Sequence, residues 1–325
     1  MEFRTSIKTS ENRGMICHSD VVVMMGSCFS DNIGARMRHA MFNVDINPFG
    51  TLYNPFSIAT SIDRIIDNEP VDGSHMFQNG GVWNSFLFHS KFSRVDKMRA
   101  MEMMNERITA AHEHLREAKA LIITLGTAVV YRLKSTGKVV SNCHKVPQHE
   151  FVRKMESIEA MTEVLDHSLT RLRQLNPDIK VIITVSPIRH VADGLETNML
   201  SKASLRVVAS TLAGRFRDMV SYFPAFEIML DDLRDYRFYA ADMVHPSETA
   251  IEYIWQTFQA TYFDDRTAQA AARCERVYKR LMHRPMTDNR EAIERFNADT
   301  RTVVSNLIRE YPYIANISEI RNVLD

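Results

Sequence analysis

The chain has 325 residues, and its 40 basic and 40 acidic side chains cancel to a formal net charge of zero. This length suits one large domain with an additional helical region, and the balanced charge argues against the basic surface that non-specific nucleic-acid binding needs. No apolar stretch approaches the roughly 20 residues that span a bilayer, and the first residues do not form a secretory signal. We therefore expect a soluble cytoplasmic protein that binds neither nucleic acid nor membrane.

The four cysteines are spread along the chain and form no CxxC pair. Widely spaced cysteines favour reduced thiols over a disulfide framework or a zinc ribbon. The twelve histidines include no HExxH motif and no cluster with cysteine at the spacing of metal ligands. We therefore expect neither a metal site nor any other cofactor.

An unbroken apolar run at residues 21–25 ends in a glycine and predicts a buried strand followed by a turn. The turn carries Ser27 and Cys28, and a helix capped near Ser30 or Asp31 follows it. Open α/β sheets keep their reactive groups at the carboxyl ends of strands, and a helix N-terminus lowers the pKa of a thiol. The turn is therefore a candidate for chemistry, although a Ser-Cys pair after a strand is also typical of a turn with a buried thiol.

Residues 43–57 combine a short strand with a loop that is dense in Asn, Pro and Gly. Such a loop has a specific backbone conformation, so it is either an ordinary connection or a support for groups that bind a ligand. Its candidate residues are Gly50 and Asn54. Residues 73–93 are unusually aromatic and predict a small apolar core in preference to a pocket wall.

Two further apolar runs, at residues 120–125 and 180–185, have the pattern of buried strands. Helix-length segments join these strands, so the chain repeats βαβ units. The pattern predicts an α/β protein with a doubly wound parallel sheet and right-handed crossovers. Helices are expected at residues 57–68, 95–118, 155–175 and 201–221, the last capped by Asn198 or Ser201.

The strand at residues 120–125 ends in a second glycine turn, which carries Gly126 and Thr127. A hairpin over residues 129–140 follows this turn and leads to Asn142 and His144. These polar side chains either clamp a substrate or only mark the end of a surface strand.

The last strand is expected at residues 222–229, and a helix begins near Ser247. From residue 264 onward the composition changes to long charged helices without candidate chemistry. We therefore predict a domain at residues 1–263 and a helical extension at residues 264–325. The extension either covers the sheet or forms a homo-oligomer through its helices.

Asp242 and His245 lie just before the helix that begins near Ser247. Their spacing lets the carboxylate fold back on the imidazole and hold one tautomer, while the other ring nitrogen faces a nucleophile. An isolated DxxH pair is common and by itself is weak evidence for catalysis. Here it lies immediately before the last helix of a sheet protein whose first strand is followed by Ser27 and Cys28, and this position makes it a candidate.

A chain order with the nucleophile after the first strand and an Asp-x-x-His pair before the last helix resembles that of the SGNH (GDSL-like) hydrolases, a flavodoxin-like α/β/α family of esterases. The chain is still more similar to the related GSCFA family, named for the turn that stands here as Gly26-Ser27-Cys28-Phe29-Ser30. The similarity extends over about residues 3–260 and rests on several further segments. These are residues 47–55, 125–127, 142–145, 186–187, 201–203, 233–239 and 242–246.

The resemblance implies an esterase, or more broadly an acyl hydrolase or acyltransferase, that acts on an acylated carbohydrate or another small ester through a covalent acyl-enzyme. The position of the SGNH serine falls on Cys28, although a shift of one residue would give the role to Ser27. We expect Cys28 to carry the acyl group. Asp242 and His245 would complete the catalytic set.

The resemblance departs from ordinary SGNH enzymes at Gly126 and Thr127, where the asparagine that serves as an oxyanion donor is missing. Its place would be taken by Thr127, Asn54 or Asn142, and the N–H groups of Cys28 and Gly50 would complete the oxyanion hole. His144 would contribute to substrate binding.

A second hypothesis is a binding or scaffold protein that kept this fold and lost the chemistry, which the missing asparagine supports. A Rossmann cofactor protein is disfavoured, because no GxGxxG follows the first strand.

Overall fold

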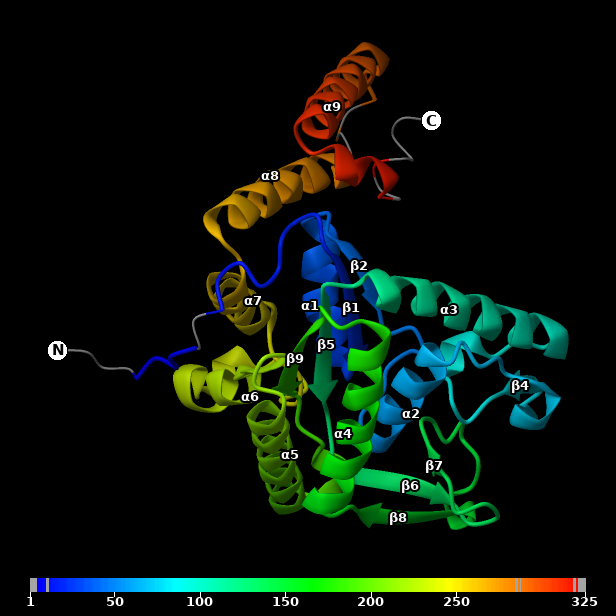
Figure 1. The fold of residues 1–325 in the computed structure, drawn as a ribbon. Helices are drawn as coiled ribbons and strands as arrows, with labels where there is room; N and C mark the ends of the chain where they lie inside the picture. The colour runs from blue at the N-terminus through cyan, green and yellow to red at the C-terminus, as the bar shows by residue number, and fades with distance from the viewer. Residues whose placement is uncertain (1–4, 10–11, 284–285, 287, 318–319, 321–325) are drawn as a thin grey trace.

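A five-stranded parallel sheet forms the centre of the computed structural model, which describes residues 5–9, 12–283, 286, 288–317 and 320 (Figure 1). Taken in chain order, the parallel strands follow the spatial order 2-1-3-4-5 that is typical of flavodoxin-like folds. From one edge to the other, the strands are β10 (Val220–Phe223), β9 (Lys180–Val185), β5 (Ala120–Leu125), β1 (Val21–Gly26) and β2 (Asn43–Ile46).

The three strands predicted from apolar runs lie side by side in this sheet. β1 pairs with β5 in parallel, with Val23 opposite Leu121, and β5 pairs with β9 in parallel, with Leu121 opposite Val181. Nearly all residues of these strands are buried, which requires cover on both faces of the sheet. The predicted parallel architecture is therefore confirmed.

Helices cover both faces of the sheet and make three layers. Val23 and Met25 of β1 pack into the core beneath one helical layer, whereas Val22 and Met24 pack toward the other. The first layer contains α2 (Pro55–Ile66), α3 (Lys97–Glu117), α4 (Ile158–Leu175) and α5 (Leu195–Arg215). The second contains α1 (Cys28–His39), the short α6 (Ala225–Glu227) and α7 (Glu248–Tyr262).

Two small antiparallel sheets are inserted between these elements. The first is the hairpin of β3 (Phe77–Asn79) and β4 (Val82–Asn84). The second contains β6 (Val129–Leu133), β7 (Val139–Val140) and β8 (Phe151–Met155), and it follows the carboxyl end of β5. A π-helical turn spans Ile228–Leu233, and short 3₁₀ helices lie at Gly73–His75, Ser90–Phe92, Gln148–Glu150, Val191–Asp193, Tyr236–Phe238 and Pro312–Asn316.

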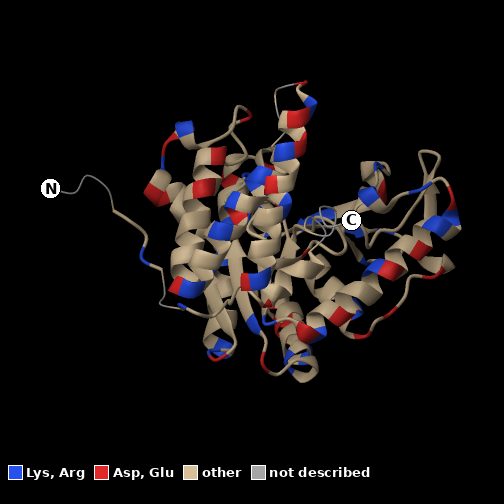
Figure 2. Ribbon diagram, turned by 90° about the horizontal axis from the view of Figure 1, so that it is seen from above, with Lys and Arg blue, Asp and Glu red and all other residues tan. Residues whose placement is uncertain are grey.

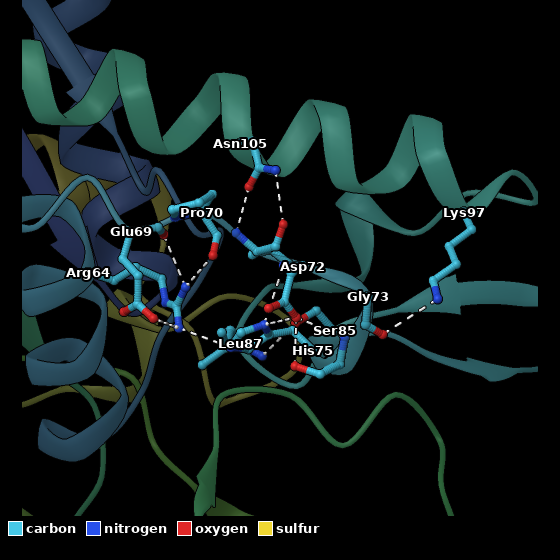
Figure 3. Close-up of polar contacts among 12 residues, drawn as sticks. Arg64, Glu69, Pro70, Asp72, Gly73, His75, Ser85, Leu87, Lys97 and Asn105 are labelled. Carbon is cyan, nitrogen blue, oxygen red and sulfur yellow. Dashed lines mark hydrogen bonds and ion pairs between the residues drawn. The ribbon is translucent and has the colours of Figure 1, made fainter.

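Polar contacts fasten the β3–β4 insertion to the helical layer (Figure 3). The Arg64 guanidinium donates to the carbonyls of Glu69 and Pro70, at 3.0 Å each. The Asn105 amide of α3 makes two hydrogen bonds with the backbone of Val71. These bonds fix the chain that leads into the aromatic segment, where rings such as Phe77 and Phe86 stack on one another.

Several element boundaries differ from the sequence prediction, and two of the differences are at the starts of helices. The first helix begins at Cys28, because the Ser27 hydroxyl rather than Ser30 or Asp31 caps it. α5 begins at Leu195, since the Ser201 hydroxyl accepts a hydrogen bond from the Ala128 N–H instead of capping a helix.

The expected strand at residues 222–229 is wrong from residue 224 onward. β10 ends at Phe223 because the next residue is Pro224, which cannot donate to a strand ladder. Ala225, Ile228 and Met229 then turn one apolar face into the core at helical spacing. β8 is a further strand, in a region where the sequence pattern indicated none.

The C-terminal helices α8 (Asp265–Met282) and α9 (Arg290–Glu310) form a small core of their own with Met41. In Figure 1 they lie beyond the end of the sheet that is opposite to β6 and β8. The expected helical extension is therefore present, but α8 and α9 extend from one end of the sheet instead of layering over its faces. Self-association through these helices stays a prediction.

Basic and acidic residues are interspersed along the helices in Figure 2. Most of the described arginines that pair with carboxylates do so at exposed positions, as Arg99 does with Glu102. None of the described helices has both the length and the apolar character needed to cross a membrane.

Candidate active site

A cleft of about 510 Å³ opens at the carboxyl ends of β1, β5 and β9. Parallel sheets of this topology hold their ligands at this edge. The β6–β7 hairpin and the loop after β9 both line the cleft. The lining residues that bear on chemistry are Ser27, Cys28, Tyr53, Asn54, Thr127, Asn142, Cys143, Arg189, His190 and His245.

The tight turn after β1 places Cys28 in the cleft. Gly26 has φ +142°, and a Cβ at this position would lie 2.2 Å from the Thr124 carbonyl oxygen. Only glycine allows this approach of β1 to β5. The Ser27 hydroxyl, which is almost fully buried, accepts a hydrogen bond from the Phe29 N–H and caps α1. Cys28 is therefore the first helical residue, where backbone N–H groups lack intrahelical partners.

The loop after β2 is bonded directly to this turn. The Asn47 side chain accepts a hydrogen bond from the Gly26 N–H at 2.9 Å and donates to the Asp31 carboxylate at 2.7 Å. The Leu52 N–H donates to the Gly26 carbonyl. These bonds explain why the loop is rich in Asn, Pro and Gly, because its backbone must follow the Gly26 turn closely.

The same loop brings Tyr53 over Cys28. The Tyr53 carbonyl accepts hydrogen bonds from the N–H groups of Gly126 and Thr127, both at 2.8 Å. Its phenol oxygen then lies 3.4 Å from the Cys28 sulfur. Burial, followed by the interaction with Cys28, raises the pKa of the Tyr53 hydroxyl, which therefore stays protonated at physiological pH.

Asp242 and His245 form a close pair at the rim of the cleft. The Asp242 carboxylate lies 2.6 Å from His245 Nδ1 and also accepts the backbone N–H groups of His245 and Val244. These hydrogen bonds, led by the backbone bond from His245, lower the pKa of Asp242 to about 2. The carboxylate is thus charged and faces Nδ1 of His245, which leaves Nε2 on the side of the ring away from Asp242.

A second histidine of the cleft, His190, was not among the sequence candidates. Its ring lies edge-on to Tyr53, with centroids 5.9 Å apart, and it hydrogen-bonds the Gly126 carbonyl. Burial, with the nearby Lys202 charge, lowers the pKa of His190 to about 4, so the ring is neutral. The feature of the sequence that could have pointed to His190 is its position in the first loop after β9, at the carboxyl end of a strand.

Lys202 lies beneath the cleft and was also missed as a site residue. Its side chain is fully buried, and Nζ donates to the carbonyls of Gly126 at 2.6 Å and Ser186 at 2.8 Å. These carbonyls directly follow β5 and β9, so Lys202 ties the two strand ends together. Burial lowers the pKa of Lys202 to about 7.

The three side chains considered as oxyanion donors differ in what they are bonded to. The Thr127 hydroxyl contacts the Ser201 hydroxyl at 3.2 Å and accepts from the Val129 N–H. The Asn54 amide caps α2 through Ser57.

Asn142 uses its amide oxygen to accept the His144 N–H. Among the described hydrogen bonds, none uses Asn142 Nδ2, although this residue lines the cleft. Asn142 is therefore the candidate with a free donor.

Three of the predicted oxyanion and substrate-binding residues, Gly50, Gly126 and His144, do not line the cleft. The Gly50 N–H donates to the Asn47 carbonyl at 2.8 Å, so it is already used within the loop. The His144 ring is buried and its Nε2 contacts the carbonyls of Ser85 and Phe88. The structure gives both residues a role in shaping loops. Gly126 has a similar role, since a Cβ there would lie 2.9 Å from the Tyr53 carbonyl oxygen.

No group of three or more His, Cys, Asp or Glu side chains that could hold a metal ion is found among the described residues.

Fold and site together define a flavodoxin-like α/β/α protein in which a strand-end cysteine shares a cleft with an Asp–His pair. The model of the GSCFA family matches residues 21–258, which is more than half of the chain. The protein belongs to the GSCFA family. A comparison with curated proteins gave no match.

Proposed function

We propose that this protein is an acyl hydrolase of SGNH type in which Cys28 is the nucleophile. The observation that supports the proposal most is the position of Cys28, at the N-terminus of α1 and in the same cleft as the Asp242–His245 pair. Ser27 is the weaker candidate, because its hydroxyl caps the helix and is almost fully buried.

In the first step, His245 Nε2 takes the proton of the Cys28 thiol and the sulfur attacks the ester carbonyl carbon. The partial positive charge of the α1 N-terminus stabilises the thiolate. The tetrahedral intermediate collapses, the bond to the alcohol oxygen breaks, and His245 returns its proton to the leaving alcohol. The products are an alcohol and a thioester on Cys28.

In the second step, a water molecule gives a proton to His245 and attacks the thioester, which releases the carboxylic acid and restores the thiol. An alcohol in place of water would make the protein an acyltransferase. Asp242 holds the imidazole in the tautomer that both steps need.

Negative charge develops on the carbonyl oxygen in both steps. The Cys28 N–H and Asn142 Nδ2 are the donors best placed to stabilise it, since the other candidate groups are bonded elsewhere. The Tyr53 hydroxyl, 3.4 Å from the sulfur, is a further donor.

The cleft favours a small uncharged or weakly charged ester, such as an acylated carbohydrate. Its lining carries polar groups from Asn142, Ser141 and Tyr131 beside apolar ones from Val129 and Val140. Hydroxyl and amide groups next to apolar surface are typical of sites that bind sugars and small acyl groups.

The proposal is tested by alkylation of the thiols with iodoacetamide at neutral pH and mapping of the products by mass spectrometry. We expect Cys28 to react fastest and His245→Ala to slow its reaction. Cys143 is the internal reference, because it lines the same cleft while burial raises its pKa. Hydrolysis of p-nitrophenyl acetate is measured in parallel.

Alkylation of Cys28 no faster than that of Cys143, with activity that survives Cys28→Ala but not Ser27→Ala, would move the nucleophile to Ser27. Absence of both ester hydrolysis and selective alkylation would instead support the binding-protein hypothesis.

A further inference from the structure

A second, smaller cavity adjoins the candidate active site. Its volume is about 140 Å³, many times the 10–15 Å³ that one water molecule needs. Ile188 and Arg189 line both this cavity and the catalytic cleft. We call it the α5 cavity, and its other walls are mostly apolar: Pro187, Leu195, Met199, Phe226, Leu230 and Tyr236.

Arg189 forms the boundary between the two spaces and is held in place by aromatic rings. Its guanidinium lies 3.9 Å from the Tyr239 ring centroid and 5.1 Å from that of Tyr236. No ion pair between Arg189 and a carboxylate is found among the described residues. The guanidinium therefore packs against the two tyrosine rings, which hold Arg189 at the boundary of the α5 cavity without a carboxylate partner.

Large apolar side chains are exposed around the α5 cavity. Leu195 and Met199, on the first turns of α5, are 57% and 49% exposed, and Tyr236 is 59% exposed. Val191, which is also about half exposed and lines the catalytic cleft, extends this surface to that cleft. Exposed apolar side chains that border a cavity mark a binding site for an apolar group.

We propose that the α5 cavity binds the hydrocarbon part of the substrate acyl group, and that the substrate is an ester of an unbranched fatty acid of medium length. This inference rests on the proposed function. An acyl chain whose carbonyl lies at Cys28 leaves the cleft past Ile188 and Arg189 and enters the α5 cavity between Leu195 and Phe226. Apart from Arg189 at its boundary and Asn198, the lining is apolar, which favours hydrocarbon over a sugar.

The first test is a chain-length series of p-nitrophenyl esters from acetate to decanoate. We expect kcat/KM to rise about fourfold for each added methylene until the cavity is full, which corresponds to about 0.8 kcal/mol per buried methylene. Met199→Trp fills the cavity and should flatten this series. Leu200→Trp is the matched control, because Leu200 is the next residue of α5 and is exposed but does not line the cavity.

The second test does not depend on catalysis. Sodium octanoate is titrated into wild-type protein and both tryptophan variants, and binding is measured by calorimetry. Saturable binding that Met199→Trp removes and Leu200→Trp keeps supports the inference, even when no ester is hydrolysed and the proposed function fails. If octanoate does not bind and the chain-length series is flat, the inference is overturned. Acetate hydrolysis by the same protein would still support the proposed hydrolase. An equal loss in both variants would also overturn it, because it would indicate adsorption to the helix surface.

Discussion

The two ends of the central sheet use the same kinds of side chain in opposite ways. At the amino end, His18 is 3% exposed and both ring nitrogens are bonded, Nδ1 to the Tyr313 hydroxyl and Nε2 to the Ala40 carbonyl. At the carboxyl end, the His245 side chain is 45% exposed and Nδ1 is bonded to Asp242. None of the described hydrogen bonds uses His245 Nε2.

Burial and the number of hydrogen-bond partners therefore distinguish a structural histidine from a candidate catalytic one, whereas residue type does not. His18 packs among Phe42, Tyr311 and Tyr313 and joins the C-terminal extension to the sheet. Its hydrogen-bonding capacity is filled, so nothing remains for a substrate. The groups of the cleft keep donors or acceptors that face an open space, and a substrate can satisfy them.

The largest effect should come from Cys28→Ala. We expect ester hydrolysis to fall by at least about 10⁴-fold, because the variant cannot form the acyl-enzyme. The free energy of unfolding should change by less than about 1 kcal/mol, since the thiol is only partly buried. Cys143→Ala, in the same cleft, is the control and should keep its activity. A comparable loss in both variants would show that the cleft is merely sensitive to its thiols.

Asn142→Ala should have the next largest effect. Loss of an oxyanion donor lowers kcat by about 10²–10³-fold with little change in KM. Steady-state kinetics with p-nitrophenyl acetate measures both constants, and Ser141→Ala is the neighbouring control. A raised KM with unchanged kcat would assign Asn142 to the binding of substrate in its ground state.

His18→Ala should act on stability alone. Removal of a buried ring and its two hydrogen bonds should lower the free energy of unfolding by about 2–4 kcal/mol, as measured by urea titration. The kcat of the folded protein should not change, because His18 lies at the far end of the sheet. His18→Phe keeps the ring packing and so separates its contribution from that of the hydrogen bonds. A loss of kcat in folded His18→Ala protein would contradict the division between the two ends.

Lys202 gives a pH-dependent difference in stability. Its pKa is lowered to about 7 from an ordinary value near 10.5, so the unfolded chain binds the extra proton between these pH values. Stability contributed by this group is therefore lowest below pH 7 and rises with pH toward 10.5, by about 1.4 kcal/mol per pH unit at most. Urea unfolding of wild type and Lys202→Met at pH 7, 8, 9 and 10 measures the difference. A constant difference across this range would show that Lys202 does not change charge.

The site residues predicted from the sequence fall into two groups. In one group the polar atoms already make hydrogen bonds within the protein, and in the other they remain available in the cleft. Cys28, Asn142 and His245 line the cleft with atoms to spare. Gly50 and His144 have the expected special backbone and polar character, but the structure uses both to hold loops. Sequence spacing cannot separate these outcomes, because loop-holding and ligand-binding groups are the same residue types.

The sequence by itself determined the parallel sheet and the strand-end turn. Apolar runs that are buried on both faces and joined by helix-length crossovers have few other arrangements, and Gly26 is required where β1 approaches Thr124. The pairing of Asp242 with His245 was also predictable from the sequence, because only two residues separate them.

Only the tertiary structure decided which other groups complete the cleft. Tyr53 reaches Cys28 across 25 positions of the chain, and Lys202 reaches Gly126 across 76. The α5 cavity likewise joins the loop after β9 to the turn after β10. Contacts of this kind depend on how loops from different strands meet at one edge of the sheet, and no local pattern of apolar and polar residues encodes that meeting.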